Sequence, residues 1–171
     1  MPVIILEGAD NTGKSTLAEA LHAHFGPNAV VVKSPAKYFD WDDSMNEWTS
    51  EFVEASSVMS SNFYFILDRV PEISELIYGA IFRTPCTERF PHFLRSLQSH
   101  RVMFVLCTHD GFEEGELDKV GNLIAQPNHE KIVAAYTVMS YVLARSGVQV
   151  HLFNRDIKDS TRRLIERIED M

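Results

Sequence analysis

The feature that most constrains the fold is a glycine-containing stretch at residues 8–15, which reads G-A-D-N-T-G-K-S. It fits the pattern G-x-x-x-x-G-K-[ST]. A continuous apolar run at 3–6 precedes it, and apolar residues at helical spacing follow it over 15–25. In the order strand, glycine loop, helix, the N–H groups of the loop and the positive end of the helix face phosphate oxygens. The sequence therefore predicts a phosphate-binding loop that takes a nucleoside triphosphate.

Each residue type in this loop has a role that its chemistry explains. Gly8 and Gly13 allow backbone conformations and close approaches that a side chain would obstruct. Lys14 supplies a cation for the β- and γ-phosphates, and the Ser15 hydroxyl is the expected ligand of Mg²⁺. The predicted nucleotide-binding residues are Gly8, Asn11, Thr12, Gly13, Lys14, Ser15 and Thr16.

Five short apolar runs alternate with segments of helical character along the chain. Runs that are apolar throughout are typical of strands buried on both faces, as in a parallel sheet with helices on either side. No repeat, low-complexity tract or linker interrupts the pattern. We therefore expect one α/β domain over residues 1–171. Its expected strands are 3–6, 29–33, 63–67, 102–107 and 148–153, and its expected helices are 15–25, 44–61, one from 71 onward, 87–100, 128–146 and one from 156 or 159 to the C-terminus.

The carboxyl ends of parallel strands meet at one edge of the sheet, where ligands bind. Asp68 ends the third predicted strand and is placed to hold Mg²⁺ directly or through water. Arg69 follows it and can bind a second phosphate with its planar guanidinium group. A surface salt bridge at the strand end is the alternative interpretation of this pair. The cleft predicted at this edge is formed by residues 8–15, 33–37, 68–69 and 107–110.

The composition limits the partners and the location that we expect. The chain is 45% hydrophobic, which is enough for a full core, and its net charge is −8. This acidity argues against a chain built mainly to hold a nucleic-acid backbone. We see no membrane span and expect no signal peptide. Cys86 and Cys107 form no C-x-x-C motif, and the seven histidines show no metal-ligand spacing. We therefore expect a cytoplasmic protein without a membrane or nucleic-acid partner.

Two motifs resemble a known family. Residues 6–16, L-E-G-A-D-N-T-G-K-S-T, resemble the E-G-x-D-x-x-G-K-S-T opening of thymidylate kinases, and Asp68-Arg69 matches the D-R of that family. Residues 74–79 with the later Arg83 are similar to the continuation in its compact, phage-type members. The resemblance implies a P-loop NTPase of the nucleoside monophosphate kinase type, with a five-stranded parallel sheet in the order 2-3-1-4-5. It also implies a homodimer.

The reaction implied by the resemblance is transfer of the γ-phosphoryl group of ATP, with Mg²⁺, to dTMP or a related pyrimidine deoxynucleotide. In that family the aspartate matching Asp10 approaches the acceptor's sugar, and the arginine matching Arg69 binds the acceptor's phosphate. Ser15 and Asp68 are the implied Mg²⁺ ligands. A monophosphate is already anionic, so the protein has to position the substrates and neutralise charge rather than provide a general base. The implied catalytic residues are Lys14, Asp68, Arg69 and Arg83.

Two segments are expected to complete the site: an acceptor-binding region at about 34–62 and a lid-like segment at about 109–127. In the first, Lys37 and Phe52 are the candidates for substrate binding, through charge and base stacking respectively. A packing role for each is the alternative. Tyr136 is expected to pack in the core, with a hydroxyl group supplied to the cleft as its alternative role.

The sequence departs from the family in its arginines. Family members often bring an arginine from the lid or from the phosphate loop, but residues 109–127 contain Lys119 and no arginine. Asn11 and Thr12 of the phosphate loop supply none either. The helix before the third strand lacks the arginine that usually helps to read thymine, which leaves the acceptor base open. Our first candidate for the missing phosphate contact is Arg83, and the alternatives are Arg89 and Arg95.

Other functions stay open at this stage. A deoxynucleoside kinase would need a carboxylate base beside a 5′-hydroxyl group, for which Glu7 or Asp68 could serve. A polynucleotide 5′-kinase would need a basic groove, which the net charge of −8 does not favour. A nucleotide-dependent switch or binding protein would need no small acceptor, although the guanine-reading motif N-K-x-D is absent.

Overall fold

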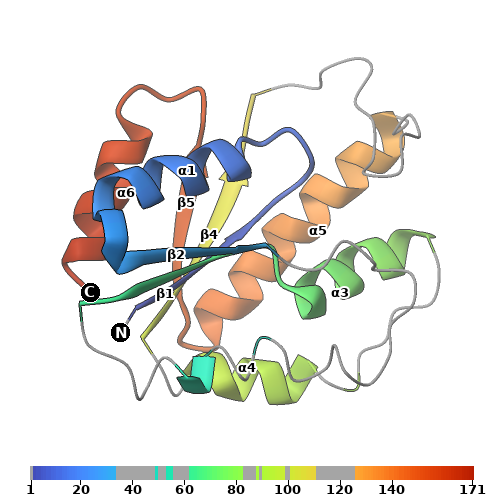
Figure 1. Cartoon of the computed structure of the whole chain (residues 1–171). Coiled ribbons are helices and arrows are strands. Elements are labelled where there is room, and N and C mark those ends of the chain that lie inside the picture. Colours follow the sequence, from blue (N-terminus) through green and yellow to red (C-terminus); the bar gives the residue numbers. More distant parts are fainter. Residues whose placement is uncertain are drawn as a thin grey trace.

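The computed structural model describes residues 2–33, 49, 53–55, 62–82, 88, 90–98, 101–110 and 126–171. Five strands form one sheet in the order β2-β3-β1-β4-β5, and every neighbouring pair is parallel (Figure 1). This confirms the predicted fold class and strand order. The strands are β1 (Val3–Glu7), β2 (Ala29–Lys33), β3 (Tyr64–Asp68), β4 (Val102–Thr108) and β5 (Gln149–Asn154).

Helices cover both faces of the sheet (Figure 1). On one face, apolar residues of two helices pack against the strands in a single buried cluster with Ile4 and Leu6. Among the described residues, the other face carries three longer helices, which pack in a second cluster with Val3 and Ile5. The first pair is α1 (Lys14–Phe25) and α6 (Ser160–Glu169), and the other three are α3 (Pro71–Phe82), α4 (Phe90–Gln98) and α5 (Gln126–Arg145); a 3-10 turn, η1 (Gly26–Asn28), follows α1.

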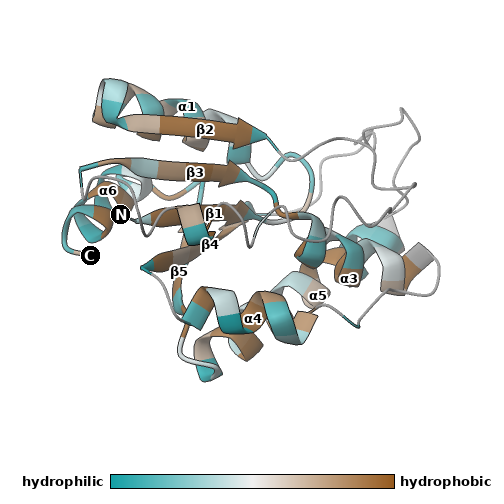
Figure 2. Ribbon diagram, turned by 60° about the horizontal axis from the view of Figure 1, so that its bottom comes forward, coloured by the Kyte–Doolittle hydropathy of each residue, from teal (hydrophilic) through white to brown (hydrophobic). Residues whose placement is uncertain are grey.

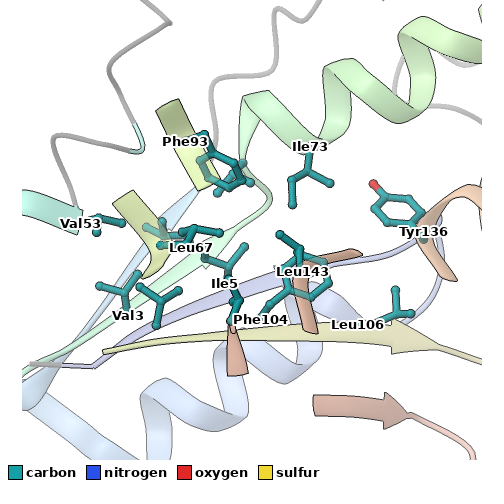
Figure 3. Packing of buried hydrophobic residues seen from close by; sticks show 14 of the residues in the cluster. Val3, Ile5, Val53, Leu67, Ile73, Phe93, Phe104, Leu106, Tyr136 and Leu143 are labelled. Atoms are coloured by element: carbon teal, nitrogen blue, oxygen red, sulfur yellow. The ribbon is translucent and has the colours of Figure 1, made fainter. Parts of the chain in front are cut away.

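The central strand β1 contributes side chains to the buried clusters on both faces of the sheet. All five of its residues are buried, and successive side chains point to opposite faces of the sheet. Val3 and Ile5 therefore enter one cluster, which Figure 3 shows from close by, while Ile4 and Leu6 enter the other. Full burial of each such side chain stabilises the fold by about 1.5–3 kcal/mol. Figure 2 shows the strands as largely hydrophobic ribbons between the helices.

The predicted helix boundaries agree with the structure to within a few residues where it describes them. The helix predicted over 87–100 is α4, in which Pro91 lies in the first turn, where a missing N–H group costs nothing. Asp159 occupies the N-cap position of α6, although its side chain makes no capping hydrogen bond. The helix predicted over 44–61 lies outside the described residues, apart from Thr49 and the helical residues 53–55.

Among the described residues, no helix has the length and apolar character that are needed to span a bilayer.

Candidate functional site

The loop between β1 and α1 has the backbone geometry that a phosphate cradle requires. Gly8, Asn11 and Gly13 have φ angles of 146°, 58° and 82°. A Cβ atom added to Gly8 would lie 2.2 Å from the backbone oxygen of Cys107 in β4. Only glycine fits there, because the loop passes directly against the neighbouring strand. The glycine that begins the motif is thus fixed by packing against β4 as well as by backbone conformation.

Lys14 folds back into this loop. Its Nζ atom donates to the backbone oxygen of Gly8 over 3.0 Å, to Thr12 Oγ1 over 3.1 Å and also to the backbone oxygen of Ala9. Three acceptors match the three N–H donors of an ammonium group. Burial, together with the positive charge of Arg69, lowers the pKa of Lys14 to about 7. The Lys14 amine is therefore held inside the loop that it is expected to serve.

Ser15 and Asp68 meet at the mouth of the loop, as their predicted shared role requires. Ser15 Oγ donates to Asp68 Oδ2 over 3.0 Å. The parallel register that places Leu6 beside Asp68 brings these residues together, since both strands then end at the same edge. Two ligands at a right angle in an octahedral Mg²⁺ site lie about 3 Å apart. The pair of oxygens therefore fits the coordination sphere of this hard cation.

Arg69 is buried beside the same loop. Only 3% of it is exposed, and its backbone adopts a left-handed conformation with φ of 72°. Its guanidinium group donates to Tyr136 Oη over 2.9 Å and forms an ion pair with Asp10. Burial alone would lower the pKa of Arg69. The electrostatic effects of its neighbours outweigh this and raise the pKa well above its ordinary value; these neighbours are Tyr136, Tyr78, Glu7 and Asp10. The arginine is a permanent cation that several neighbours hold in one orientation.

Glu7 orients the turn that carries Arg69. It is fully buried, and its carboxylate accepts from the backbone N–H of Val70 over 2.6 Å and from the hydroxyl of Tyr136 over 2.9 Å. Its Oε2 atom lies 4.0 Å from the guanidinium group of Arg69. Burial raises the pKa of Glu7, and the charge of Arg69 opposes that rise. These contacts place Glu7 behind Arg69, where it supports the arginine.

Lys14, Ser15, Asp68 and Arg69 line one cavity of about 400 Å³. The cavity brings eight of the predicted site residues together with Arg155, which the sequence interpretation missed. Arg155 directly follows β5, so its place at the carboxyl edge of the sheet was the signal that could have identified it. The lining residues are Asp10, Asn11, Gly13, Lys14, Ser15, Thr16, Asp68, Arg69 and Arg155.

The remaining predicted residues do not line this cavity or lie outside the description. Gly8 packs against β4, and Thr12 is buried with its hydroxyl bonded to the backbone oxygen of Ala9 over 2.9 Å. Arg95 lies on the exposed side of α4 and does not line the cavity. Within the described part of the chain, no cluster of three or more His, Cys, Asp or Glu side chains is arranged to hold a metal ion. Outside the described residues lie Lys37, Phe52, Arg83, Arg89, nearly all of the acceptor-binding region at 34–62 and residues 111–125 of the lid-like segment.

Comparison with known proteins identifies the fold. No known family profile matches the sequence, and no curated protein does. The chain is similar to the structure of the YorR protein from Bacillus subtilis in complex with phosphorylated GDP, with a TM-score of 0.67, 19% identity and coverage of 98% of this chain and 95% of that chain. It is also similar to deoxyadenosine kinase from M. mycoides (TM-score 0.61, 12% identity, 99% and 100% coverage) and to thymidylate kinase from Candida albicans (TM-score 0.58, 17% identity, 98% and 91% coverage). The fold is that of the P-loop nucleoside monophosphate kinases and their relatives.

Proposed function

We propose that this protein is an ATP- and Mg²⁺-dependent kinase that transfers the γ-phosphoryl group to a deoxynucleoside monophosphate, dTMP or a related pyrimidine deoxynucleotide. The observation that carries the proposal is the position of Arg69, which lines the same 400 Å³ cavity as the phosphate loop. A phosphate loop by itself binds only the donor. A rigidly held arginine at the end of β3 supplies a second site, for the phosphate of an acceptor.

In this proposal each residue acts on charge or position. Lys14 neutralises the β- and γ-phosphates of the donor, and Arg69 holds the phosphate of the acceptor in line with the γ-phosphorus. Ser15 and Asp68 would hold Mg²⁺, which would neutralise the negative charge that develops on the transferred phosphoryl group. The attacking oxygen belongs to a phosphate that is already ionised at neutral pH, so no general base is required.

The proposal extends to parts of the chain beyond the described site. Residues 34–62 form the acceptor-binding region, where Lys37 and Phe52 contact the nucleotide, and residues 109–127 form a lid over the phosphates. Arg83 adds a further cation during transfer. The whole chain acts as one nucleoside monophosphate kinase domain, and two copies form a homodimer, as in the family that the motifs resemble.

A deoxynucleoside kinase is the second candidate. The half-buried carboxylate of Asp68 lines the cavity, where it could accept the proton of a 5′-hydroxyl group. The structural similarity to deoxyadenosine kinase is consistent with this activity. Glu7 is the weaker choice of base, because it is fully buried behind Arg69 and bonded to Val70 and Tyr136.

The deciding experiment measures ADP release from Mg·ATP with three classes of acceptor: nucleoside monophosphates, nucleosides and oligonucleotides. We expect turnover with pyrimidine deoxynucleoside monophosphates, loss of turnover in Lys14→Ala and Arg69→Ala, and normal turnover in Arg163→Ala, which removes an exposed arginine of α6. Turnover with nucleosides alone would establish the second candidate instead. ATP binding without turnover on any acceptor would contradict both kinase proposals and favour a nucleotide-dependent switch.

A further inference from the structure

We propose that Arg155 binds the terminal phosphates of the donor nucleotide and so supplies the arginine that the phosphate loop and residues 109–127 lack. This inference rests on the proposed function, because it assumes that the donor is a nucleoside triphosphate bound at the phosphate loop. It assigns a role to a residue that no sequence motif singled out.

Arg155 lies against the phosphate loop. Its guanidinium group donates to the backbone oxygen of Asn11, and a Cβ atom on Gly13 would lie 3.4 Å from both Cβ and Cδ of Arg155. Its side chain is 31% exposed and lines the cavity that contains Lys14. The arginine therefore lies against the turn of the phosphate loop while remaining accessible to a ligand in the cavity.

The strand order places Arg155 and Arg69 on opposite sides of the phosphate loop. In the sheet β2-β3-β1-β4-β5, the phosphate loop follows the central strand β1, Arg69 follows β3 on one side of it and Arg155 follows β5 on the other. The two arginines thus flank the loop from opposite sides. Because Arg69 on the β3 side faces the acceptor in the proposed reaction, Arg155 on the β5 side is left to face the donor. This arrangement neutralises both ends of the phosphate chain during transfer.

Hydrogen bonds between neighbouring segments hold the backbone that carries Arg155. The N–H group of Arg155 donates to the backbone oxygen of Thr108 over 3.1 Å, which ties the end of β5 to the end of β4. Asn154 Nδ2 donates to Asp110 Oδ1 over 2.9 Å, and the N–H group of Asp110 donates to Asp156 Oδ2 over 2.7 Å. A site that is already ordered loses less entropy when its ligand binds. These hydrogen bonds hold Arg155 in a position from which it can bind a phosphate.

The guanidinium group of Arg155 has a chemistry that suits phosphate binding. A guanidinium group has five N–H donors in a planar fork, so a bond to the oxygen of Asn11 is compatible with donation to phosphate oxygens as well. Asp156 lies 3.6 Å from Nε and helps to orient the fork. Lys14 offers a point charge inside the loop, whereas Arg155 offers paired donors at its outer side. The two cations are complementary in geometry as well as in position.

Equilibrium binding tests this inference without requiring catalysis. The probes are Mg·ATP and inorganic tripolyphosphate with Mg²⁺, which shares the phosphate chain of ATP but has no base. We expect Arg155→Ala to weaken the binding of both probes by about 10- to 100-fold, since it removes charge-assisted hydrogen bonds. Arg162→Ala is the matched control, because Arg162 is an exposed arginine of α6 that pairs with Asp159 and Glu166. We expect it to bind both probes as the wild type does.

Two further variants separate phosphate binding from support of the loop. Arg155→Gln keeps a donor for the oxygen of Asn11 but removes the charge, so we expect the same loss of binding with an unchanged thermal unfolding midpoint. Arg155→Lys keeps the charge and is expected to recover part of the affinity. Weakened binding of Mg·ATP with unchanged binding of tripolyphosphate would overturn the inference in favour of a base contact. Full affinity in Arg155→Gln would overturn it in favour of a purely structural role.

The outcomes also distinguish this inference from the proposed function. If wild-type protein binds neither probe, both fail. If it binds Mg·ATP and shows the Arg155 effect but transfers phosphate to no acceptor, the kinase proposal fails and the assignment of Arg155 stands. If it is a kinase whose Arg155→Gln variant binds both probes normally, the function stands and the assignment of Arg155 fails.

Discussion

The hydroxyl of Tyr136 donates to Oε2 of Glu7 over 2.9 Å and so connects the middle of α5 to the end of β1. The same hydroxyl accepts a hydrogen bond of 2.9 Å from Arg69. Burial and the charge of Glu7 raise the pKa of Tyr136, so the hydroxyl keeps its proton across the physiological range. One phenol therefore holds both the proposed acceptor-binding arginine and the carboxylate that supports it.

Replacing this phenol tests the positioning role. In Tyr136→Phe, the buried carboxylate of Glu7 loses an O–H donor and Arg69 loses an acceptor, which we expect to destabilise the fold by about 1–3 kcal/mol. Because Arg69 then has a less defined orientation, we expect a several-fold higher KM for the acceptor and an unchanged KM for ATP. Steady-state kinetics with each substrate varied in turn measures both values.

Tyr141→Phe is the matched control for this change, because Tyr141 lies on the same helix but is 63% exposed. It should behave as the wild type. If Tyr136→Phe raised the two KM values equally, or lowered stability while leaving both unchanged, Tyr136 would be a packing residue without a part in acceptor binding.

The contact between Ser15 and Asp68 predicts a shared dependence on Mg²⁺. Removing either oxygen, by Ser15→Ala or Asp68→Asn, is expected to raise the Mg²⁺ concentration needed for half-maximal activity by about 10-fold or more. Titration of activity with free Mg²⁺ at constant ATP measures this, with Asp170→Asn at the exposed end of α6 as the control. An unchanged Mg²⁺ requirement in both variants would remove these two residues from the metal site.

The sequence was sufficient for the fold because the three central strands, β3, β1 and β4, are short, nearly continuous apolar runs. All residues of β1 are buried, and six of the seven in β4 are as well, so their runs carry a clear signal. The phosphate loop was equally readable, since glycine and lysine at fixed spacing have few other uses. Because the carboxyl ends of parallel strands meet at one edge of the sheet, the sequence also predicted that Asp68 and Arg69 lie beside this loop. In the structure both residues line the same cavity as the loop.

The interactions that support the site could not be predicted in this way. Tyr136 and Glu7 are 129 positions apart, and a buried tyrosine gives the same apolar pattern whether or not its hydroxyl has a functional partner. The contact of Arg155 with Asn11 spans 144 positions and depends on the register between β4 and β5. Periodicity describes which face of an element is buried, whereas these contacts depend on which elements end at the same place.

Gly8 provides a test of packing at the phosphate loop. Gly8→Ala would put a Cβ atom 2.2 Å from the backbone oxygen of Cys107 at a φ of 146°, and neither backbone can move easily. We expect a loss of about 3–5 kcal/mol in the free energy of unfolding, measured by chemical denaturation. Gly147→Ala is the control: its φ is 86°, but a Cβ atom there would have no neighbour within 4 Å, so only the conformational cost of about 1–2 kcal/mol applies. Equal losses in the two variants would contradict the packing argument.

The lowered pKa of Lys14 predicts that ATP binding takes up a proton. With a pKa of about 7, against an ordinary 10.5, the buried amine is mostly neutral at pH 8. The folded protein then holds fewer protons than the unfolded chain, so the contribution of Lys14 to stability increases with pH between about 7 and 10.5. Phosphates favour the ammonium form, so ATP binding at pH 8 should be accompanied by proton uptake if the pKa returns towards its ordinary range.

Calorimetric titrations with ATP in buffers of different ionisation enthalpy measure this uptake. The affinity for ATP should correspondingly fall as the pH rises from 7 to 9. In Lys14→Arg the side chain stays charged at pH 8, so binding, although weaker, should take up no proton. Binding by the wild type without proton uptake would mean that Lys14 is already an ammonium at pH 8, held in that form by the three oxygens around its Nζ atom.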